Sequence, residues 1–422
     1  MRILVIGGGG REHAIVWALQ KSERVKEIFC APGNAGIAQL AECAPIAVDK
    51  FDELIAYAQN KQVDLVFVGP DDPLAAGIVD AFEAAGIPTY GPRKNAAEIE
   101  GSKIFMKNLL RKYNIPTAKY ETFTDYEAAL AYLRQQEVPI VIKSDGLAAG
   151  KGVTVAATLE EAEEALRSMM VDKVFGNSGN SVVIEEFLAG EEMSILAFVD
   201  GETVRAMSPA QDHKQVFDND KGPNTGGMGT YSPLPHIEQS IIDDAIENII
   251  KPTAKAMVSE GRPFRGVLFA GLMITKDGRA KTIEFNARMG DPETQVVLPR
   301  LKTPLFDIVE ASMNGTLADL PIEWSDEAHV CVVMASEGYP ASYPKGRVIE
   351  GIPAAEAQGA LVFHAGTATK DGRLVTNGGR VLGIVGRGRD IAEARKRAYE
   401  AVSVINFEGA HSRTDIAMKA LR

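Results

Sequence analysis

The sequence predicts an α/β protein of several domains that begins with a parallel sheet. Two observations support this prediction. At 422 residues the chain is too long for one ordinary core, and typical domain sizes suggest about three. Its first hundred residues alternate between short apolar runs and amphipathic stretches, which is typical of parallel strands joined by helices.

In this first domain, ligands are expected at the carboxyl ends of the strands, where the glycine-rich turns lie. Those turns cover residues 7–10, 31–36 and 69–72. We expect strands at 2–6, 27–30, 63–68 and 87–90, and helices at 11–21, 51–60 and 72–85.

The pattern changes after Gly91-Pro92, where a smaller lid-like unit is expected. It combines helices at 103–113, 126–136 and 159–170 with strands at 139–143 and 181–187. Further along, we expect strands at 280–285, 329–334 and 381–385, and a helix at 391–402.

The composition argues against several classes of protein. The net charge of -12 argues against a nucleic-acid partner, and no span is long and apolar enough for a membrane helix. The N-terminus does not have the pattern of a signal peptide. The cysteines Cys30, Cys43 and Cys331 show no metal-ligand spacing and suit a reducing compartment, so we expect a cytoplasmic protein.

The first motif is the glycine run at 7–10, which follows a strand and leads into a helix. Free amides at Gly8 and Gly9, together with Arg11, could bind an anion. A dinucleotide fingerprint is disfavoured, because Glu12 and His13 stand where its last glycine is required. A tight turn without a ligand remains the alternative.

The second motif is the glycine-rich loop at 143–153, which follows a buried strand. It is not a Walker loop, since Gly146 and Gly150 enclose only three residues and Gly152 replaces the hydroxyl residue. Lys143, at the end of the strand, could project over bound phosphates, with Lys151 in the loop behind it. A surface hairpin is an equally good interpretation of this motif alone.

The third motif runs from Glu185 through Glu186, Phe187 and Leu188 to Glu192. An apolar wall with main-chain hydrogen-bonding groups could bind a purine, and a carboxylate could bind the hydroxyls of a ribose. Taken alone, an exposed acidic turn is the more ordinary interpretation.

The fourth motif predicts a metal site. Glu284 and Asn286 are two residues apart in a predicted strand, so both side chains point to one face. Hard oxygen ligands of this kind suit Mg²⁺, which takes its remaining ligands from phosphate and water. Arg288, Asp291 and Glu293 follow directly and concentrate charge there.

The fifth motif joins Asp212 to a long glycine-rich loop at 221–229. Loops of this kind are often functional, and the amides around Thr225 and Gly226 could bind an anion or a carboxylate. A plain flexible loop is equally compatible with the composition.

Together and in this order, the second, third and fourth motifs resemble the ATP-grasp superfamily. The whole chain resembles the phosphoribosylamine–glycine ligases, down to the glycine run with Arg11-Glu12-His13 and the turn Pro32-Gly33-Asn34. The Asp212-His213-Lys214 motif, the 224–229 loop and the segment 284–293 are specific to this family. Asp71 departs from the pattern, because a glutamate is expected there.

The resemblance implies an N-terminal pre-ATP-grasp sheet, an ATP-grasp fold of two α+β lobes with a lid, and a small C-terminal α/β domain. The expected boundaries are 1–102 for the first domain, 103–122 for a linker, 123–193 for the lid, 194–325 for the central lobe and 326–422 for the last domain.

The resemblance also implies the reaction and the residues that serve it. Glycine, 5-phosphoribosylamine and ATP would give glycinamide ribonucleotide through glycyl phosphate, with Mg²⁺ or Mn²⁺ at Glu284 and Asn286. Lys143, Arg288 and Asp212 would be catalytic. ATP would be bound by Lys103, Lys143, Gly150, Lys151, Gly152, Glu185, Glu186, Phe187, Leu188 and Glu192. The other substrates would be bound by Gly8, Gly9, Arg11, Asn34, Asp212, Thr225, Gly226, Arg288, Asp291 and Glu293.

Three alternatives remain at this stage. A different ATP-grasp ligase or carboxylase would use another acid or amine. A nucleotide-sensing protein would bind ATP without chemistry, and a nicotinamide oxidoreductase would need the glycine spacing that is missing. Small molecules are the expected partners, and we expect a monomer.

Overall fold

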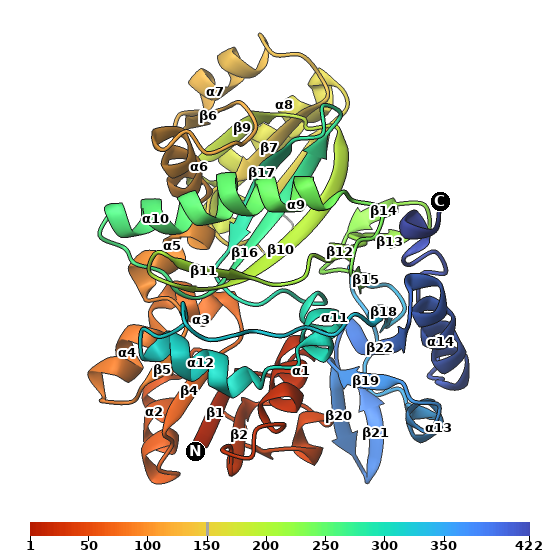
Figure 1. Cartoon of the computed structure of the whole chain (residues 1–422). Coiled ribbons are helices and arrows are strands. Elements are labelled where there is room, and N and C mark those ends of the chain that lie inside the picture. Colours follow the sequence, from red (N-terminus) through yellow and green to blue (C-terminus); the bar gives the residue numbers. More distant parts are fainter. Residues whose placement is uncertain (149–151) are drawn as a thin grey trace.

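The computed structural model describes residues 1–148 and 152–422. Figure 1 shows the lid at the top, the central sheet in the middle, the N-terminal domain at the lower left and the C-terminal domain at the right. The expected α/β architecture with a parallel N-terminal sheet, an ATP-grasp fold and a C-terminal domain is confirmed.

The N-terminal sheet is parallel and has the strand order β3-β2-β1-β4-β5. Its central strand β1 is flanked by β2 and β4, so the turn after β1 lies where the strand order reverses. The strands are β1 (Arg2–Gly7), β2 (Glu27–Pro32), β3 (Glu42–Cys43), β4 (Leu65–Val68) and β5 (Thr89–Tyr90).

The helices of this domain are α1 (Gly10–Leu19), α2 (Phe51–Asn60), α3 (Asp71–Ala76), α4 (Ile78–Ala84) and α5 (Lys94–Gly101). The single helix expected at 72–85 is wrong, because the chain turns at Gly77 between α3 and α4. Gly77 has a φ of 97°, a left-handed conformation that glycine adopts without strain.

The lid is an antiparallel sheet with the order β6-β9-β7-β8, backed by two helices. Side chains that alternate along β7 and β9, such as Ile142 and Ile184, pack against the helices. Helix α6 (Lys103–Lys112) leads into it. Its elements are β6 (Tyr120–Phe123), α7 (Tyr126–Leu133), β7 (Ile140–Ser144), β8 (Val153–Ala156), α8 (Leu159–Met170) and β9 (Val182–Glu186).

The central sheet is antiparallel with the order β11-β10-β16-β17, and α9 and α10 cross in front of it in Figure 1. The longest pairing joins β10 to β16, from Gly190 opposite Thr275 to Asp200 opposite Arg265. The elements are β10 (Gly190–Asp200), β11 (Thr203–Ala206), α9 (Gln239–Ala245), α10 (Lys251–Ser259), β16 (Arg265–Thr275), β17 (Ala280–Asn286), α11 (Thr294–Val297) and α12 (Leu305–Met313).

The C-terminal sheet has the order β12-β15-β18-β22-β19 and includes two strands from the middle of the chain. These are β12 (Gln211–Asp212) and β15 (Gly229–Ser232), which flank the glycine-rich loop. The sequence pattern did not indicate this pairing. The other elements are β13 (Gln215–Phe217), β14 (Lys221–Asn224), β18 (Ala328–Ala335), α13 (Ile352–Ala357), β19 (Leu361–His364), β20 (Thr367–Lys370), β21 (Arg373–Thr376), β22 (Arg380–Gly388) and α14 (Ile391–Val404).

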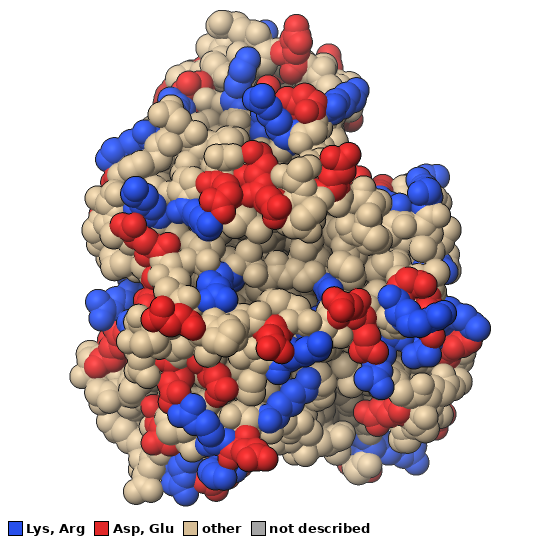
Figure 2. Space-filling model, in the orientation of Figure 1, with Lys and Arg blue, Asp and Glu red and all other residues tan. Residues whose placement is uncertain are grey.

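The surface carries both signs of charge. On the face drawn in Figure 2, Lys and Arg side chains are interspersed with Asp and Glu, and they form no continuous basic strip there. Within the described ranges, no helix combines the length and the apolar character needed to cross a bilayer.

Candidate active site

The base of the lid holds a buried carboxylate between two lysines. Glu185, on β9, forms ion pairs with Lys143 on the neighbouring strand β7 and with Lys107 on α6. The three side chains are 4%, 4% and 0% exposed, respectively, so their charges are shielded from water. The cluster carries a formal charge of +1, which suits an anionic ligand.

Lys143 also reaches across to the central sheet. Its Nζ donates a hydrogen bond of 3.1 Å to the carbonyl oxygen of Ile283 in β17. The next residue in that strand is Glu284. The structure therefore brings Lys143 to the strand that carries the predicted metal ligands.

Glu284 is surrounded by cations from three parts of the chain. Burial opposes its ionisation, but Lys214, Lys143 and Lys103 together hold the pKa of Glu284 below its usual value. Glu284 pairs with Gly271 of β16, next to an irregularity in the register. An ionised carboxylate at this position is a suitable ligand for a hard cation.

Glu284 and Asn286 offer two oxygen ligands, and more ligands are needed for a metal. In the described part of the chain, no group of three or more His, Cys, Asp or Glu side chains is placed to hold a metal ion. Mg²⁺ commonly takes one or two protein ligands and completes its shell with phosphate oxygens and water. The donor set therefore fits a metal that is bound together with a nucleotide.

A second charged cluster follows directly after β17. The Nη2 atom of Arg288 donates to Oδ1 of Asn286 at 3.1 Å and lies 3.1 Å from Oε1 of Glu100. Asp71 is 3.9 Å from the same nitrogen. Burial raises the pKa of Glu100 to about 7, although Arg288 acts against this shift.

Asp212, at the end of β12, is expected near the acyl group. Burial and the neighbouring Glu293 raise the pKa of Asp212 well above its ordinary value, and burial also raises the pKa of Glu293. A side chain at Gly227 would lie within 2.8 Å of the Asp212 carboxylate, so the loop can approach only as glycine. Two neighbouring carboxyl groups whose pKa values are raised by burial are typical of a functional site.

The first part of the loop expected at 221–229 is strand β14, and the rest is fixed to the segment between β12 and β13. Thr225 donates to the carbonyl oxygen of Lys214 at 2.8 Å, and Gly227 donates to Thr225 Oγ1 at 3.0 Å. Arg380, from β22, donates to the Gly226 carbonyl oxygen at 2.7 Å and lies 3.1 Å from Asp291. The C-terminal domain thus helps to hold the loop.

The connector between the lid and the central sheet places its acidic residues apart. Glu186 accepts a hydrogen bond from the amide of Lys119 at 3.0 Å and lies 3.3 Å from Lys281. Glu192 is on β10, 3.1 Å from Lys214. Between them, Phe187 is 41% exposed and Leu188 is partly buried, so this segment presents apolar surface.

Lys103 and the glycine-rich loop at 143–153 complete the region predicted to bind phosphates. Lys103, at the start of α6, donates from Nζ to the carbonyl oxygen of Gly146 at 2.6 Å. Gly152 packs against Ser144, where a side chain would meet its hydroxyl at 2.3 Å. Gly150 and Lys151 lie outside the described residues.

The glycine turn of the N-terminal domain is organised by Glu12. The amide of Gly9 donates to Glu12 at 2.7 Å, so it is not free as expected, and the buried Arg11 donates to the same carboxylate at 2.5 Å. Asn34 donates to the carbonyl oxygen of Gly8 at 3.0 Å. A side chain at position 69 would lie 2.1 Å from Glu12, so only glycine fits there without moving the carboxylate.

Comparison with known proteins identifies the family. The sequence matches three domains of phosphoribosylglycinamide synthetase: the N domain over residues 1–100, the ATP-grasp (A) domain over 101–294 and the C domain over 329–419. The chain belongs to the phosphoribosylglycinamide synthetase family. It is therefore an ATP-grasp enzyme that forms a carbon–nitrogen bond.

Relatives in the family match along their full length. The chain is 52% identical to the phosphoribosylamine–glycine ligase of Caldanaerobacter subterraneus subsp. tengcongensis, over 99% of each protein. It is 51% identical to that of Halalkalibacterium halodurans, over 100% of this chain and 97% of the relative. The crystal structure of the Thermotoga maritima ligase superposes with a TM-score of 0.86 at 36% identity, covering 99% of this chain and 100% of that one.

A more distant structure shares only the fold. The biotin carboxylase domain of the Hydrogenobacter thermophilus 2-oxoglutarate carboxylase, crystallised with MgADP, ADP and bicarbonate, superposes with a TM-score of 0.73 at 15% identity. It covers 97% of this chain and 91% of that one.

Three charged residues that pair with the predicted site residues had no role assigned from the sequence: Lys107, Lys214 and Glu100. Lys107 lies one helical turn after Lys103, so spacing alone could have placed both on one face of α6. Lys214 stands within a quoted motif. Glu100 had no signal, because its role depends on a contact with Arg288 from a distant part of the chain.

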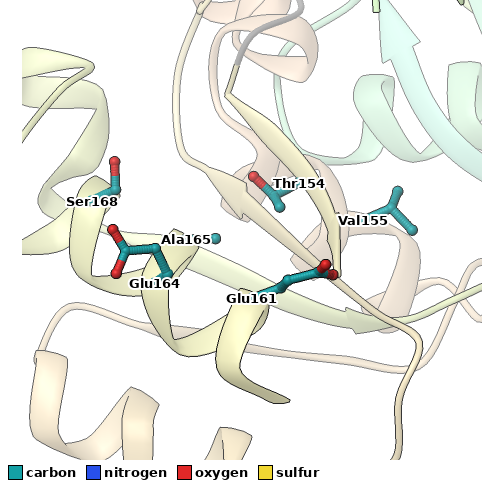
Figure 3. A pocket seen from close by; sticks show the side chains of 6 residues that line it. All are labelled: Thr154, Val155, Glu161, Glu164, Ala165 and Ser168. Carbon is teal, nitrogen blue, oxygen red and sulfur yellow. The ribbon is translucent and has the colours of Figure 1, made fainter. Parts of the chain in front are cut away.

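A separate hollow lies in the lid, between β8 and α8 (Figure 3). It is lined by Thr154, Val155, Glu161, Glu164, Ala165 and Ser168. Among the described residues that line it, two are acidic and none is basic, which does not favour a phosphate-bearing ligand.

Proposed function

We propose that the enzyme joins glycine to 5-phosphoribosylamine, with ATP converted to ADP and phosphate. The observation that carries this proposal is the contact of Lys143, a member of the cationic lid cluster, with the strand that holds Glu284 and Asn286. Relatives that carry the name phosphoribosylamine–glycine ligase support the choice of acid and amine.

In the first step, a carboxylate oxygen of glycine attacks the γ-phosphorus of ATP, and ADP leaves. Such a transfer depends on positioning and on neutralising charge more than on covalent chemistry. Lys103 and Lys143 would hold the phosphates. Mg²⁺ or Mn²⁺ at Glu284 and Asn286 would supply charge stabilisation of the phosphoryl group.

In the second step, the amine of phosphoribosylamine attacks the carbonyl carbon of glycyl phosphate, and phosphate leaves. The amine nitrogen must lose a proton as the amide forms. We assign proton acceptance to Asp212, whose carboxylate lies against Gly227 of the glycine-rich loop. Arg288 and the amides around Thr225 and Gly226 would bind the acyl phosphate.

The remaining contacts follow the domain arrangement. Gly8, Gly9, Arg11 and Asn34 would bind the sugar phosphate at the strand ends of the N-terminal sheet. Asp291 and Glu293 would lie near the glycine ammonium group. Adenine would be bound by the main chain and apolar surface of Glu185, Glu186, Phe187 and Leu188, the ribose by Glu192, and the phosphates by the loop with Gly150, Lys151 and Gly152.

The proposal extends to the organisation of the protein. We propose domain boundaries at 1–102, 103–122, 123–193, 194–325 and 326–422, with 123–193 as the closing lid. A lid is expected because an acyl phosphate hydrolyses readily and must be kept from water. We further propose a cytoplasmic monomer whose partners are ATP, glycine and 5-phosphoribosylamine.

The test is a coupled assay with freshly prepared phosphoribosylamine. ADP release should require both glycine and phosphoribosylamine, and glycinamide ribonucleotide should accumulate in equal amount. Bicarbonate and D-alanine in place of glycine separate this reaction from those of other ATP-grasp enzymes. Release of ADP with either of these, and none with glycine, would reject the proposed substrates.

A further inference from the structure

Glu100, in the last turn of α5, contacts the segment that directly follows β17. Its Oε2 accepts a hydrogen bond from the amide of Ala287 at 2.8 Å, and its Oε1 lies 3.1 Å from Nη2 of Arg288. The side chain is only 8% exposed. Because a buried carboxylate is costly unless it is paired, these two contacts fix its orientation.

The contact continues from Arg288 to a proposed metal ligand. The same Nη2 nitrogen carries two hydrogens and also donates to Oδ1 of Asn286 at 3.1 Å. This bond fixes which end of the Asn286 amide is the oxygen. That oxygen keeps a second lone pair, which remains available to a cation.

A guanidinium next to a metal ligand creates an electrostatic problem. Arg288 would repel a divalent cation held at Asn286, and the repulsion is strong where water is largely excluded. Glu100 at 3.1 Å and Asp71 at 3.9 Å from the Arg288 nitrogen offset its charge. Of the two, the Glu100 side chain is the closer and the more deeply buried, with 8% of its surface exposed against 33% for Asp71.

We propose that Glu100 is a positioning residue of the metal–nucleotide site. It orients Arg288 and Asn286 and offsets the positive charge beside them, so that an N-terminal helix sets the affinity for metal-bound nucleotide. This inference rests on the proposed function, because it takes Glu284 and Asn286 as the metal ligands.

The same helix offers a matched control. Glu98, two residues earlier, also pairs with an arginine of the central part of the chain, Arg262. That pair does not include Arg288 or the metal ligands. Glu98→Gln therefore removes the same charge from the same helix and one ion pair to the central part of the chain, from a side chain that is 41% exposed.

The experiment measures ADP binding by calorimetry, once with saturating Mg²⁺ and once with a chelator. For Glu100→Gln we expect affinity for MgADP to fall by about 10-fold to 100-fold, the usual cost of removing a group that supports a metal ligand. Metal-free ADP should bind as it does to the unsubstituted chain. Glu98→Gln should change neither affinity, and Glu284→Gln should remove the magnesium effect.

An equal loss of affinity with and without Mg²⁺ in Glu100→Gln would overturn the proposal, because it would indicate a general structural role. So would an unchanged affinity for MgADP. If that variant does not fold, Glu100→Asp takes its place, since the shorter side chain cannot reach both Ala287 and Arg288. A magnesium effect in Glu100→Asp equal to that of the unsubstituted chain would then overturn it.

This test is separate from that of the reaction. Phosphate release that depends on glycine and phosphoribosylamine is measured with the unsubstituted chain alone. Its absence would reject the proposed reaction, whereas the magnesium dependence of ADP binding would still decide the role of Glu100.

Discussion

Two largely buried charge clusters contact β17 or the segment that follows it, and their compositions are opposite. In the lid cluster, one carboxylate, Glu185, lies between the ammonium groups of Lys107 and Lys143. In the cluster after β17, one guanidinium, that of Arg288, lies between the carboxylates of Glu100 and Asp71. The formal charges are therefore +1 and -1.

This difference matches two kinds of ligand. A buried charge cluster with a surplus of one sign is costly by itself and becomes favourable when a ligand of the other sign binds. The lid cluster suits a phosphate, and the β17 cluster, together with Glu284, suits a cation. A metal–nucleotide complex carries both, so it can compensate the two clusters at once and hold the lid against the central sheet.

The largest expected effect is on turnover. In Glu284→Gln, the carboxylate that faces the cation loses its charge, and we expect kcat to fall by about 100-fold to 1000-fold, as is typical when one preorganised electrostatic group is removed. The variant should still fold, because glutamine keeps the size of the side chain, but its melting temperature should fall somewhat, because Lys214, Lys143 and Lys103 lose a carboxylate partner. Steady-state assays at saturating Mg²⁺ measure this, and near-normal turnover would show that Glu284 is not a ligand.

Substitutions of Glu185 and of Lys143 in the lid cluster should have different effects on stability and on kcat. Glu185→Gln leaves two buried ammonium groups without a counter-ion, and loss of such a partner typically costs about 3 to 5 kcal/mol of unfolding free energy. Lys143→Met should cost less stability, because Glu185 keeps Lys107 as a partner, yet it should lower kcat more. Urea unfolding and kinetics on both variants test this, and the reverse ranking in stability would contradict the described pairing.

The lid cluster should also depend on pH. Burial lowers the pKa of Lys107 from its ordinary 10.5 to about 8, although Glu185 acts against the shift. Between these values the unfolded chain binds more protons than the folded one, so this group's contribution to stability rises with pH. The affinity for ADP should fall over the same range, by at most about tenfold per pH unit for one proton. In Lys107→Met, calorimetry should show that this fall is absent.

The smallest effect is expected for an ion pair outside both clusters. Arg134 and Glu163 pair at 2.7 Å on the surface of the lid, where their side chains are 56% and 32% exposed. Water screens such a pair, so Arg134→Gln should leave the melting temperature and kcat unchanged. A loss of stability as large as that of Glu185→Gln would contradict the expectation that the buried ion pairs contribute more to stability than this exposed one.

Much of this architecture could be predicted from the sequence because it depends on local patterns. The alternation of apolar runs gave the parallel sheet, and the period of two placed Glu284 and Asn286 on one strand face. The helix from Phe51 to Asn60 and the helix from Leu159 to Met170 have the expected bounds.

The rest depends on contacts between distant segments. Glu100 and Arg288 are far apart in the chain, and no period or spacing connects them. The pairing of β15 with β18 brings the glycine-rich loop to the C-terminal sheet, which the sequence did not indicate. Gly77 ended a helix early, although a single glycine in a helical pattern is often tolerated.

The central claim, that both clusters bind one metal–nucleotide complex, can be tested by crystallography with Mn²⁺ and a non-hydrolysable ATP analogue. We expect an anomalous manganese peak between Glu284 and Asn286, with phosphate oxygens bound to the same ion and in contact with Lys143. A manganese position away from both side chains, or a triphosphate that Lys143 does not contact in the closed enzyme, would contradict it.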